Sequence, residues 1–153
     1  MRVSAKADYA VRAMIELALE GDEAEPVKGE RIAEAQAIPL RFLENILAEL
    51  RHAGLAQSRR GIDGGYWLAR AADDITVADI IRAVEGPLAT VRGEPPDELS
   101  FDGGAKPLRE VWLALRANIR EILESVTLAD IASGELPEPV RAIAEHPDVW
   151  QAR

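Results

Sequence analysis

Two segments at the start of the chain carry apolar residues at helical spacing. The first begins after Ser4, a residue type that caps helices well, and ends near Gly21; its apolar stripe consists of Ala7, Val11, Met14, Leu17 and Ala18. An acidic loop, "GDEAEP", follows. A second, short helix is indicated over residues 29–36, with Ile32 and Ala33 facing inward. The pattern predicts two amphipathic helices in the first 36 residues.

A third helix is predicted within residues 37–55, where Pro39 suits the first turn and Gly54 suits the C-terminal stop. Its expected buried stripe consists of Phe42, Leu43, Ile46, Leu47 and Leu50. The opposite face carries polar or small side chains at i, i+3, i+4 and i+7, namely Arg41, Glu44, Asn45 and Ala48. These four residues are expected to share one exposed surface.

This exposed face has the chemistry of a surface that reads DNA bases. An arginine side chain can donate two hydrogen bonds to guanine, and an asparagine can both donate to and accept from adenine. A glutamate can accept a hydrogen bond from the cytosine amine. The small Ala48 allows the helix to approach closely. A merely solvated face is the commoner explanation for any single charged helix face. Two short helices, a longer one and a basic hairpin form a more specific combination.

The stretch "RRGIDGGYWLAR", residues 59–70, predicts that hairpin. Strand-like segments, "LAQSRR" and "YWLAR", flank a tip of residues that tolerate positive φ. A phosphate-binding glycine loop would have to lead from a strand into a helix, and "YWLARAADD" does not begin a helix. The glycines therefore favour a hairpin over a nucleotide site.

In the second half, a fourth helix is expected to open at Ile75 and Thr76. Thr76 and Asp79 resemble a capping box, Ile75 and Ile80 a hydrophobic staple, and Gly86 ends the helix. Residues 87–106 are rich in proline, glycine and acid, and we expect an irregular linker there.

The longest helix is predicted to start at Pro107. It carries apolar residues spaced 4, 3, 4, 3 and 4 apart, namely Leu108, Trp112, Leu115, Ile119, Ile122 and Val126. A seam of this kind favours a homodimer, although packing against the chain's own core is the alternative. Thr127 and Asp130 form a second predicted capping box, and the proline-containing tail after Gly134 is expected to fray.

Composition and charge narrow the function further. The 153 residues include no cysteine, which removes disulfides, thiolate-ligated zinc or iron-sulfur clusters and a cysteine nucleophile. The net charge of −9 argues against a nucleic-acid partner at first. However, residues 1–70 hold ten Lys/Arg against eleven Asp/Glu, whereas residues 71–153 hold eight against sixteen. Between Arg41 and Arg70 five arginines face three acids, which leaves a local basic strip.

The sequence resembles the Rrf-two family of bacterial winged helix-turn-helix regulators. The matching pieces, in family order, are "YAVRAMIELA", "IPLRFLENILAELRHAGLAQSRRGIDGGYWLAR", "ITVADIIRAVEGPL", and "LREVW" followed by "VTLADI". The resemblance implies a recognition helix at about residues 39–53, a wing at residues 55–70, and a dimer on a pseudo-palindromic operator. The expected DNA-binding residues are Lys28, Arg41, Glu44, Asn45, Arg51, Arg59, Arg60, Gly64, Gly65 and Tyr66.

Two departures from the family are visible. The wing tip reads "GIDGG", so Ile62 and Asp63 alter its chemistry, and an acid near phosphate is mildly unfavourable. Cluster-binding members carry cysteines between the fourth and the long helix, where this chain has none. The two histidines, His52 and His146, lie outside that linker. We therefore predict no cofactor and no metal, and leave open an unidentified small-molecule effector near Phe101 and Trp112.

The expected fold is mainly α with a small β-hairpin wing. The domains are a winged helix-turn-helix at 1–86, a linker loop at 87–106, a dimerisation helix with a short helix at 107–133, and a flexible tail at 134–153. The expected function is a homodimeric DNA-binding repressor that binds a promoter operator in the cytoplasm, associated with the nucleoid, with no membrane partner. The alternative is a winged-helix module that binds a protein. An enzyme is not predicted, since no catalytic arrangement appears.

Overall fold

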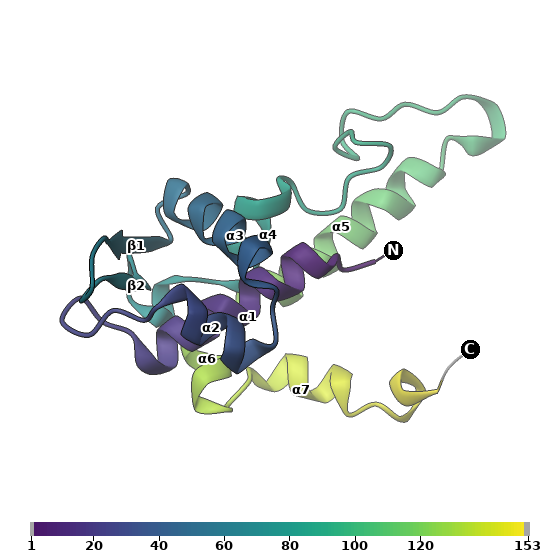
Figure 1. The fold of residues 1–153 in the computed structure, drawn as a ribbon. Coiled ribbons are helices and arrows are strands. Elements are labelled where there is room, and N and C mark those ends of the chain that lie inside the picture. Colours follow the sequence, from purple (N-terminus) through teal and green to yellow (C-terminus); the bar gives the residue numbers. More distant parts are fainter. Residues whose placement is uncertain (1, 152–153) are drawn as a thin grey trace.

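The computed structural model describes residues 2–151, and it is mainly α-helical with one small β-hairpin (Figure 1). The fold class is therefore the predicted one. The helices are α1 (Ala5–Glu20), α2 (Gly29–Gln36), α3 (Leu40–His52), α4 (Val77–Glu85), α5 (Leu108–Ser125), α6 (Leu128–Ser133) and α7 (Glu138–Ala144). The strands are β1 (Ala56–Arg59) and β2 (Gly65–Leu68), and short 3-10 turns cover Ala72–Asp74, Gly103–Ala105 and Pro147–Trp150.

Local signals mark the start of α1 and the ends of α2 and α3. The Ser4 hydroxyl accepts a hydrogen bond from the Ala7 amide at 3.0 Å, which caps α1. Ala37 ends α2 in the left-handed conformation at φ 52°, and Gly54 follows α3 at φ 75°. An ion pair between Lys6 and Glu49 at 2.8 Å links α1 to α3 across the surface. The predicted helical segments are confirmed.

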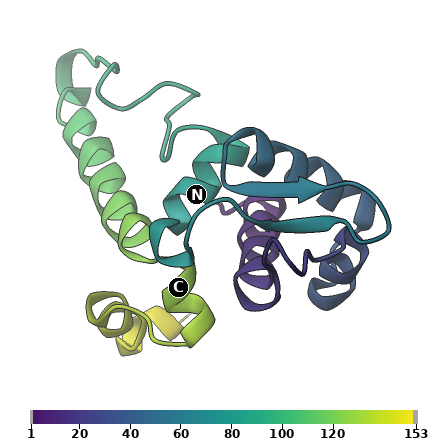
Figure 2. The same ribbon diagram turned by 90° about the vertical axis from the view of Figure 1, so that its left-hand side faces the viewer.

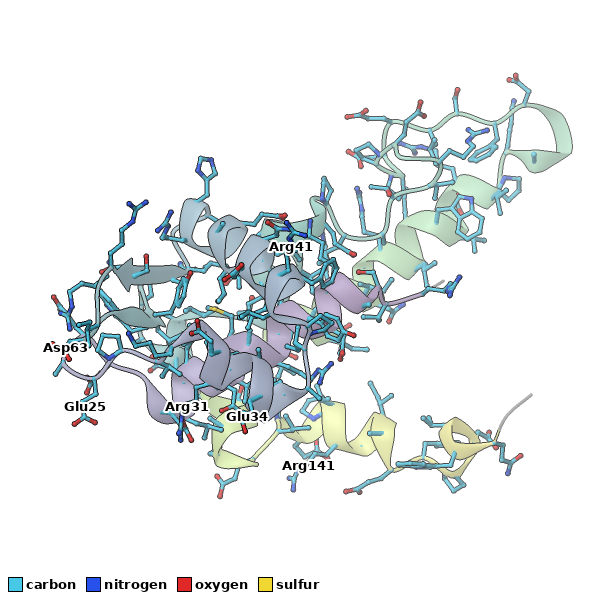
Figure 3. All side chains as sticks on the ribbon, viewed as in Figure 1. Glu25, Arg31, Glu34, Arg41, Asp63 and Arg141 are labelled. Carbon is cyan, nitrogen blue, oxygen red and sulfur yellow. The ribbon has the colours of Figure 1, made fainter. Side chains whose placement is uncertain are left out.

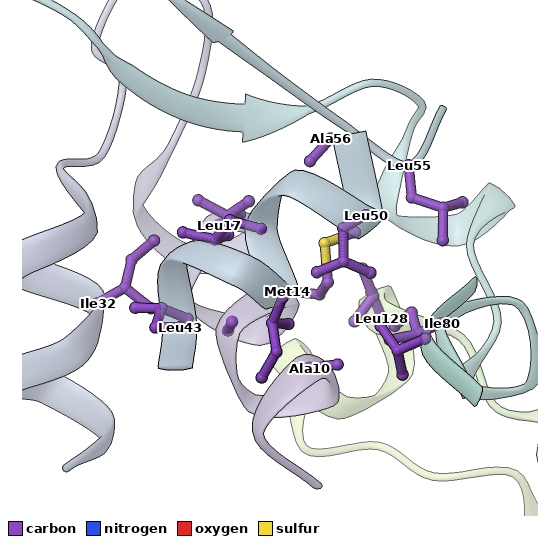
Figure 4. Close-up of a cluster of buried hydrophobic side chains, with 14 of the residues drawn as sticks. Ala10, Met14, Leu17, Ile32, Leu43, Leu50, Leu55, Ala56, Ile80 and Leu128 are labelled. Carbon is purple, nitrogen blue, oxygen red and sulfur yellow. The ribbon is translucent and has the colours of Figure 1, made fainter. Parts of the chain in front are cut away.

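A single aliphatic core lies between α1, α2 and α3, and the second half of the chain closes it (Figure 4). Fully buried side chains come from both halves, and they include Met14, Leu17, Ile32, Leu43, Leu50, Ile80 and Leu128. Each buried side chain of this size contributes about 1.5–3 kcal/mol relative to its exposed state. The polar face of α3 is held outward because this stripe faces the core.

The expected burial of Phe42 is wrong. Its side chain is 40% exposed and contacts Tyr9 edge-on, with ring centroids 5.7 Å apart. The aliphatic stripe of α3 is centred on Leu43, and a neighbouring residue lies about 100° further round the helix. Phe42 therefore stands at the edge of the stripe and covers it from the side.

The hairpin forms with a register that pairs Ala56 with Leu68 and Arg59 with Gly65. Backbone hydrogen bonds join Val27 and Tyr66 in both directions, at 2.9 and 2.8 Å, and attach the hairpin to the connection between α1 and α2. A Cβ on Gly65 would lie 2.6 Å from the Val27 carbonyl oxygen, and one on Gly64 only 2.0 Å from that of Arg59. Both glycines are required for close backbone packing.

A short backbone pairing brings the start of α6 beside the start of α4. The Val77 amide donates to the Val126 carbonyl, and the Leu128 amide to that of Ile75, each at 2.9 Å. Both predicted capping boxes are present, Thr76 with Asp79 and Thr127 with Asp130. The chain that leaves the core after α4 thus returns to it after α5.

Between α4 and α5 the chain is irregular, as predicted, but it is anchored. Leu99 and Pro96 are buried, the Arg109 guanidinium donates to the Asp97 carbonyl at 2.8 Å, and Arg116 pairs with the Asp97 carboxylate. That hydrogen bond from Arg116 holds the pKa of the Asp97 carboxyl below its usual value. Figure 2 shows this segment arching from α4 to the start of α5, which stands apart from the packed helices.

The segment after Gly134 contains an element that the sequence pattern did not predict. Pro137 precedes α7, which makes a little under two turns, and a 3-10 turn follows at Pro147–Trp150. Within α7 only Val140 is half-buried and the other side chains are exposed, so the helix has no buried stripe. None of the helices within residues 2–151 has the length and apolarity needed to cross a membrane.

Replacing Gly64 by alanine tests the close packing of the hairpin. The new methyl group overlaps the Arg59 carbonyl of the facing strand, so we expect the free energy of unfolding to fall by about 1–3 kcal/mol. Gly104→Ala is the matched control, because nothing lies within 4 Å of its Cβ position and we expect a change within about 0.5 kcal/mol. Equal effects in chemical denaturation would contradict the packing role.

Candidate nucleic-acid interface

The outer face of α3 presents side chains that the fold leaves free. Arg41, Glu44, Asn45 and Ala48 are all exposed. Within residues 2–151, no hydrogen bond or ion pair engages the Arg41, Glu44 or Asn45 side chains. Figure 3 shows Arg41 on this helix, with Asp63 at the far end of the hairpin. Polar groups on a rigid helix with no internal partner are available to an external ligand.

Two cations hold the tip of the hairpin, Lys28 at the start of α2 and Arg59 at the end of β1. The Lys28 ammonium donates to the Gly61 carbonyl at 3.0 Å and to the Ile62 carbonyl. The Arg59 guanidinium donates to the carbonyls of Glu23 and Asp63, at 3.3 Å each. Three successive carbonyls of the tip, at residues 61, 62 and 63, are therefore satisfied by positive charges.

The remaining cations of the interface behave differently from each other. Arg51, near the end of α3, donates to the Ser58 hydroxyl at 2.8 Å and ties the helix to β1. Arg60 is exposed, and the part of the chain that the structure describes offers it no hydrogen bond or ion pair. Sequence reasoning treated Lys28, Arg51, Arg59 and Arg60 alike. In the structure, Lys28, Arg51 and Arg59 form hydrogen bonds that shape the wing, whereas Arg60 has no partner among the described residues.

A polar cleft of about 340 Å³ lies between the start of α2, the face of α3 and the hairpin. Eight of the ten predicted DNA-binding residues line it, namely Lys28, Glu44, Arg51, Arg59, Arg60, Gly64, Gly65 and Tyr66. Arg41 and Asn45 stay outside the cleft lining, on α3. Glu30 and Ser58 also line the cleft, and only the tertiary fold brings them there. Four cations against Glu30 and Glu44 leave the cleft net positive.

The Gly64-Gly65-Tyr66 segment has a packing role that the sequence did not reveal. Both glycines are buried, and the Gly64 amide donates to the Gly61 carbonyl at 3.1 Å. Tyr66 is half-buried and packs against the core. These residues position the wing, and a direct contact of theirs with DNA stays a prediction.

The predicted seam of α5 is mostly unoccupied by the chain itself. Leu108, Trp112, Leu115, Ile119 and Ile122 are partly exposed, and α5 contains no fully buried residue. Val126 differs, because it is 6% exposed and its carbonyl joins the pairing with α4. Two apolar hollows flank the helix, one of about 400 Å³ at Trp112 and Leu115 and one of about 360 Å³ at Ile119 and Ile122.

The matching family and two similar relatives are all described as transcriptional regulators. Residues 3–134 match the family described as "Rrf2: Iron-dependent Transcriptional regulator". Rv1287 of Mycobacterium tuberculosis, named as a protein of the HTH-type transcriptional regulator class, is 48% identical over 95% of this chain and 89% of its own length. CymR of Bacillus subtilis, an HTH-type transcriptional regulator, is 40% identical over 87% of this chain and 91% of its own length.

Two solved structures extend the likeness to the fold. The structure of B. subtilis CymR, described as the global cysteine regulator of that organism, superimposes with a TM-score of 0.73 at 37% identity and covers 88% of this chain and 98% of its own. T. potens IscR superimposes with a TM-score of 0.69, also at 37% identity, and covers 100% of this chain and 93% of its own.

The family's description mentions iron, but this chain lacks the side chains that would ligate an iron-sulfur cluster. No cysteine is present in the sequence. Residues 2–151 also contain no group of three or more His, Cys, Asp or Glu side chains placed to hold a metal ion. Iron-sulfur clusters are held by thiolates, with histidine as a partial substitute, so this chain lacks the ligands for one.

Proposed function

Because the chain belongs to the Rrf2 family of transcriptional regulators, we propose that it binds a pseudo-palindromic promoter operator as a homodimeric repressor. The observation that supports this most is the free outer face of α3. It joins Arg41, Glu44 and Asn45 on one surface, with no internal partner among the described residues. Helices that carry such side chains read base edges in the major groove.

Each residue of the face has a separate role in this proposal. Arg41 donates its fork to guanine, Asn45 makes a paired contact with adenine, and Glu44 accepts from the amine of cytosine. Ala48 leaves the helix room to enter the groove. The operator half-site is therefore read within about one turn of α3.

In this proposal, the wing and the cleft make the contacts with DNA that do not depend on base sequence. Arg60, which is free, and the outward donors of Lys28, Arg51 and Arg59 face phosphates or the edge of the minor groove. The net negative charge of the chain does not oppose this, because the cleft is locally positive. Sixteen of the 27 acids lie in residues 71–153, and none of these lines the cleft.

The apolar seam of α5 supports the dimer. Five side chains at heptad-like spacing are partly exposed in one chain, and a second copy of α5 would bury them. A two-fold dimer would place two copies of α3 on half-sites one helical turn apart, about 34–36 Å along the DNA. Residues 1–86 would then bind DNA, residues 107–133 would dimerise, and residues 87–106 would connect them.

Signal sensing in this proposal does not use a metal cluster. The chain lacks the thiolates, so repression is either constitutive or controlled by a small molecule or protein that acts on the linker near Phe101 and Trp112. The relatives named above are regulators rather than enzymes, and no catalytic role is proposed.

Arg60→Ala tests the phosphate contacts of the wing. We expect weaker binding to most sequences and a slope of log K against log salt that is smaller by about 0.9, because one neutralised phosphate is lost. Arg141→Ala, on the exposed face of α7, is the matched control and should change neither value. If wild-type binding does not respond to salt, the chain is better explained as a protein-binding module.

Glu44→Ala tests base reading by α3. Removal of the acceptor should relax the preference at one operator position while binding to the best site changes little, which selection from a random DNA library measures. Glu145→Ala, at an exposed position at the end of α7, should leave the selected sequence unchanged. A uniform loss at every site would exclude a base-reading role for Glu44.

Ile119→Asp tests the dimer seam. A charge at a half-buried apolar position of α5 cannot be buried against a second copy, so we expect a monomeric mass in light scattering. Ile143→Asp on α7, where the side chain is 54% exposed, should leave the mass unchanged. A dimeric Ile119→Asp variant would place the interface elsewhere.

A further inference from the structure

The most exposed large apolar side chain of the described residues is Ile62, at the tip of the wing, with 92% of its surface accessible. Its neighbours in the tip are glycines and Asp63, so it has no apolar cluster to join. A side chain this exposed gains nothing for folding from its apolar surface. Its chemistry is therefore available to a ligand.

The backbone beneath Ile62 is fixed rather than loose. Lys28 donates to the carbonyl of Ile62 itself and to that of Gly61, and Arg59 donates to that of Asp63. The Gly64 amide closes the tip by donating to Gly61. Arg59 also donates to the carbonyl of Glu23, which ties the tip to the loop between α1 and α2. The tip thus offers an apolar side chain on a preorganised support.

The wing is also the right size to reach the groove next to the one that α3 would occupy. Each strand has four residues, which span about 13 Å at the usual strand rise. The major groove is about 12 Å wide, and the adjacent minor groove is about 6 Å wide. With α3 in the major groove, a hairpin of this length can reach the adjacent minor groove.

We propose that Ile62 reads the minor groove beside each half-site by apolar contact and selects A·T pairs there. The floor of the groove at an A·T pair carries only acceptors, whereas a G·C pair adds the guanine 2-amino donor. Ile62 has no acceptor for that amine and would bury it without a hydrogen bond. Apolar side chains of this kind also wedge into minor-groove steps. This inference rests on the proposed DNA-binding function.

The test changes only the minor-groove edge of the DNA. The intact chain first selects its best duplex from a random library. Each A·T pair of that duplex is then replaced in turn by 2,6-diaminopurine·T, which adds a 2-amino group to the minor groove and leaves the major-groove edge of adenine unchanged. Binding is measured by fluorescence anisotropy for the wild type, Ile62→Ala, Arg60→Ala and, as an exposed-isoleucine control, Ile143→Ala.

We expect diaminopurine at a position flanking the half-site to weaken wild-type binding by about fivefold or more, the lower range for one unfavourable base pair. Ile62→Ala should lose this sensitivity, to less than about twofold, while Ile143→Ala keeps it. Inosine·C in place of G·C in the flank should strengthen binding by the wild type and by Ile143→Ala, but not by Ile62→Ala.

Different failures have different meanings. If diaminopurine has no effect, or if its effect is the same in Ile62→Ala, Ile62 does not read the groove. If the sensitivity is lost only in Arg60→Ala, the arginine reads it instead and the inference is wrong. If the intact chain shows no salt-dependent binding to any DNA, the proposed function fails and the inference fails with it.

Discussion

The backbone pairing between Val27 and Tyr66 is the constraint on which the proposed interface depends. It is made of two hydrogen bonds, at 2.9 and 2.8 Å, and it joins the connection after α1 to the second strand of the wing. Because a side chain on Gly65 would collide with Val27, the pairing requires glycine there. It fixes the wing relative to α2, and Arg51 with Ser58 fixes it relative to α3. The two reading elements are therefore one rigid unit, as binding of two adjacent grooves demands.

Positive charge in this unit serves two purposes at once. Lys28 and Arg59 donate hydrogen bonds to the carbonyls at the wing tip. Their positive charge still contributes to the electrostatic field of the cleft. Arg60 and Arg41 are left for contact with an external partner. An acidic chain can thus carry a positively charged cleft, because four cations line the cleft against only two carboxylates. Lys28 also fixes the backbone of Ile62, whose side chain stays 92% exposed.

Much of this fold follows from local sequence signals. Helix limits come from Ser4, Gly54 and Gly86, and both capping boxes lie where Thr76 and Thr127 predict them. The outer face of α3 also follows from spacing. Phe42 was misplaced because spacing does not tell an edge position from a central one. The segment Glu138–Ala144 was missed because its side chains are all exposed or half-exposed. Lys28 holds carbonyls more than thirty residues away in the sequence, and Arg59 depends on the conformation of the wing tip and on Glu23. No local sequence signal reveals these contacts.

In the proposed complex, α3 and the wing occupy adjacent major and minor grooves in a two-fold arrangement. Hydroxyl-radical footprinting on a selected operator, combined with methylation protection of guanine N7, reports both grooves in one experiment. We expect two symmetric sets of N7 protection about one helical turn apart, each flanked by backbone protection across a minor groove. A single unsymmetrical footprint, or N7 protection without flanking minor-groove protection, would contradict it.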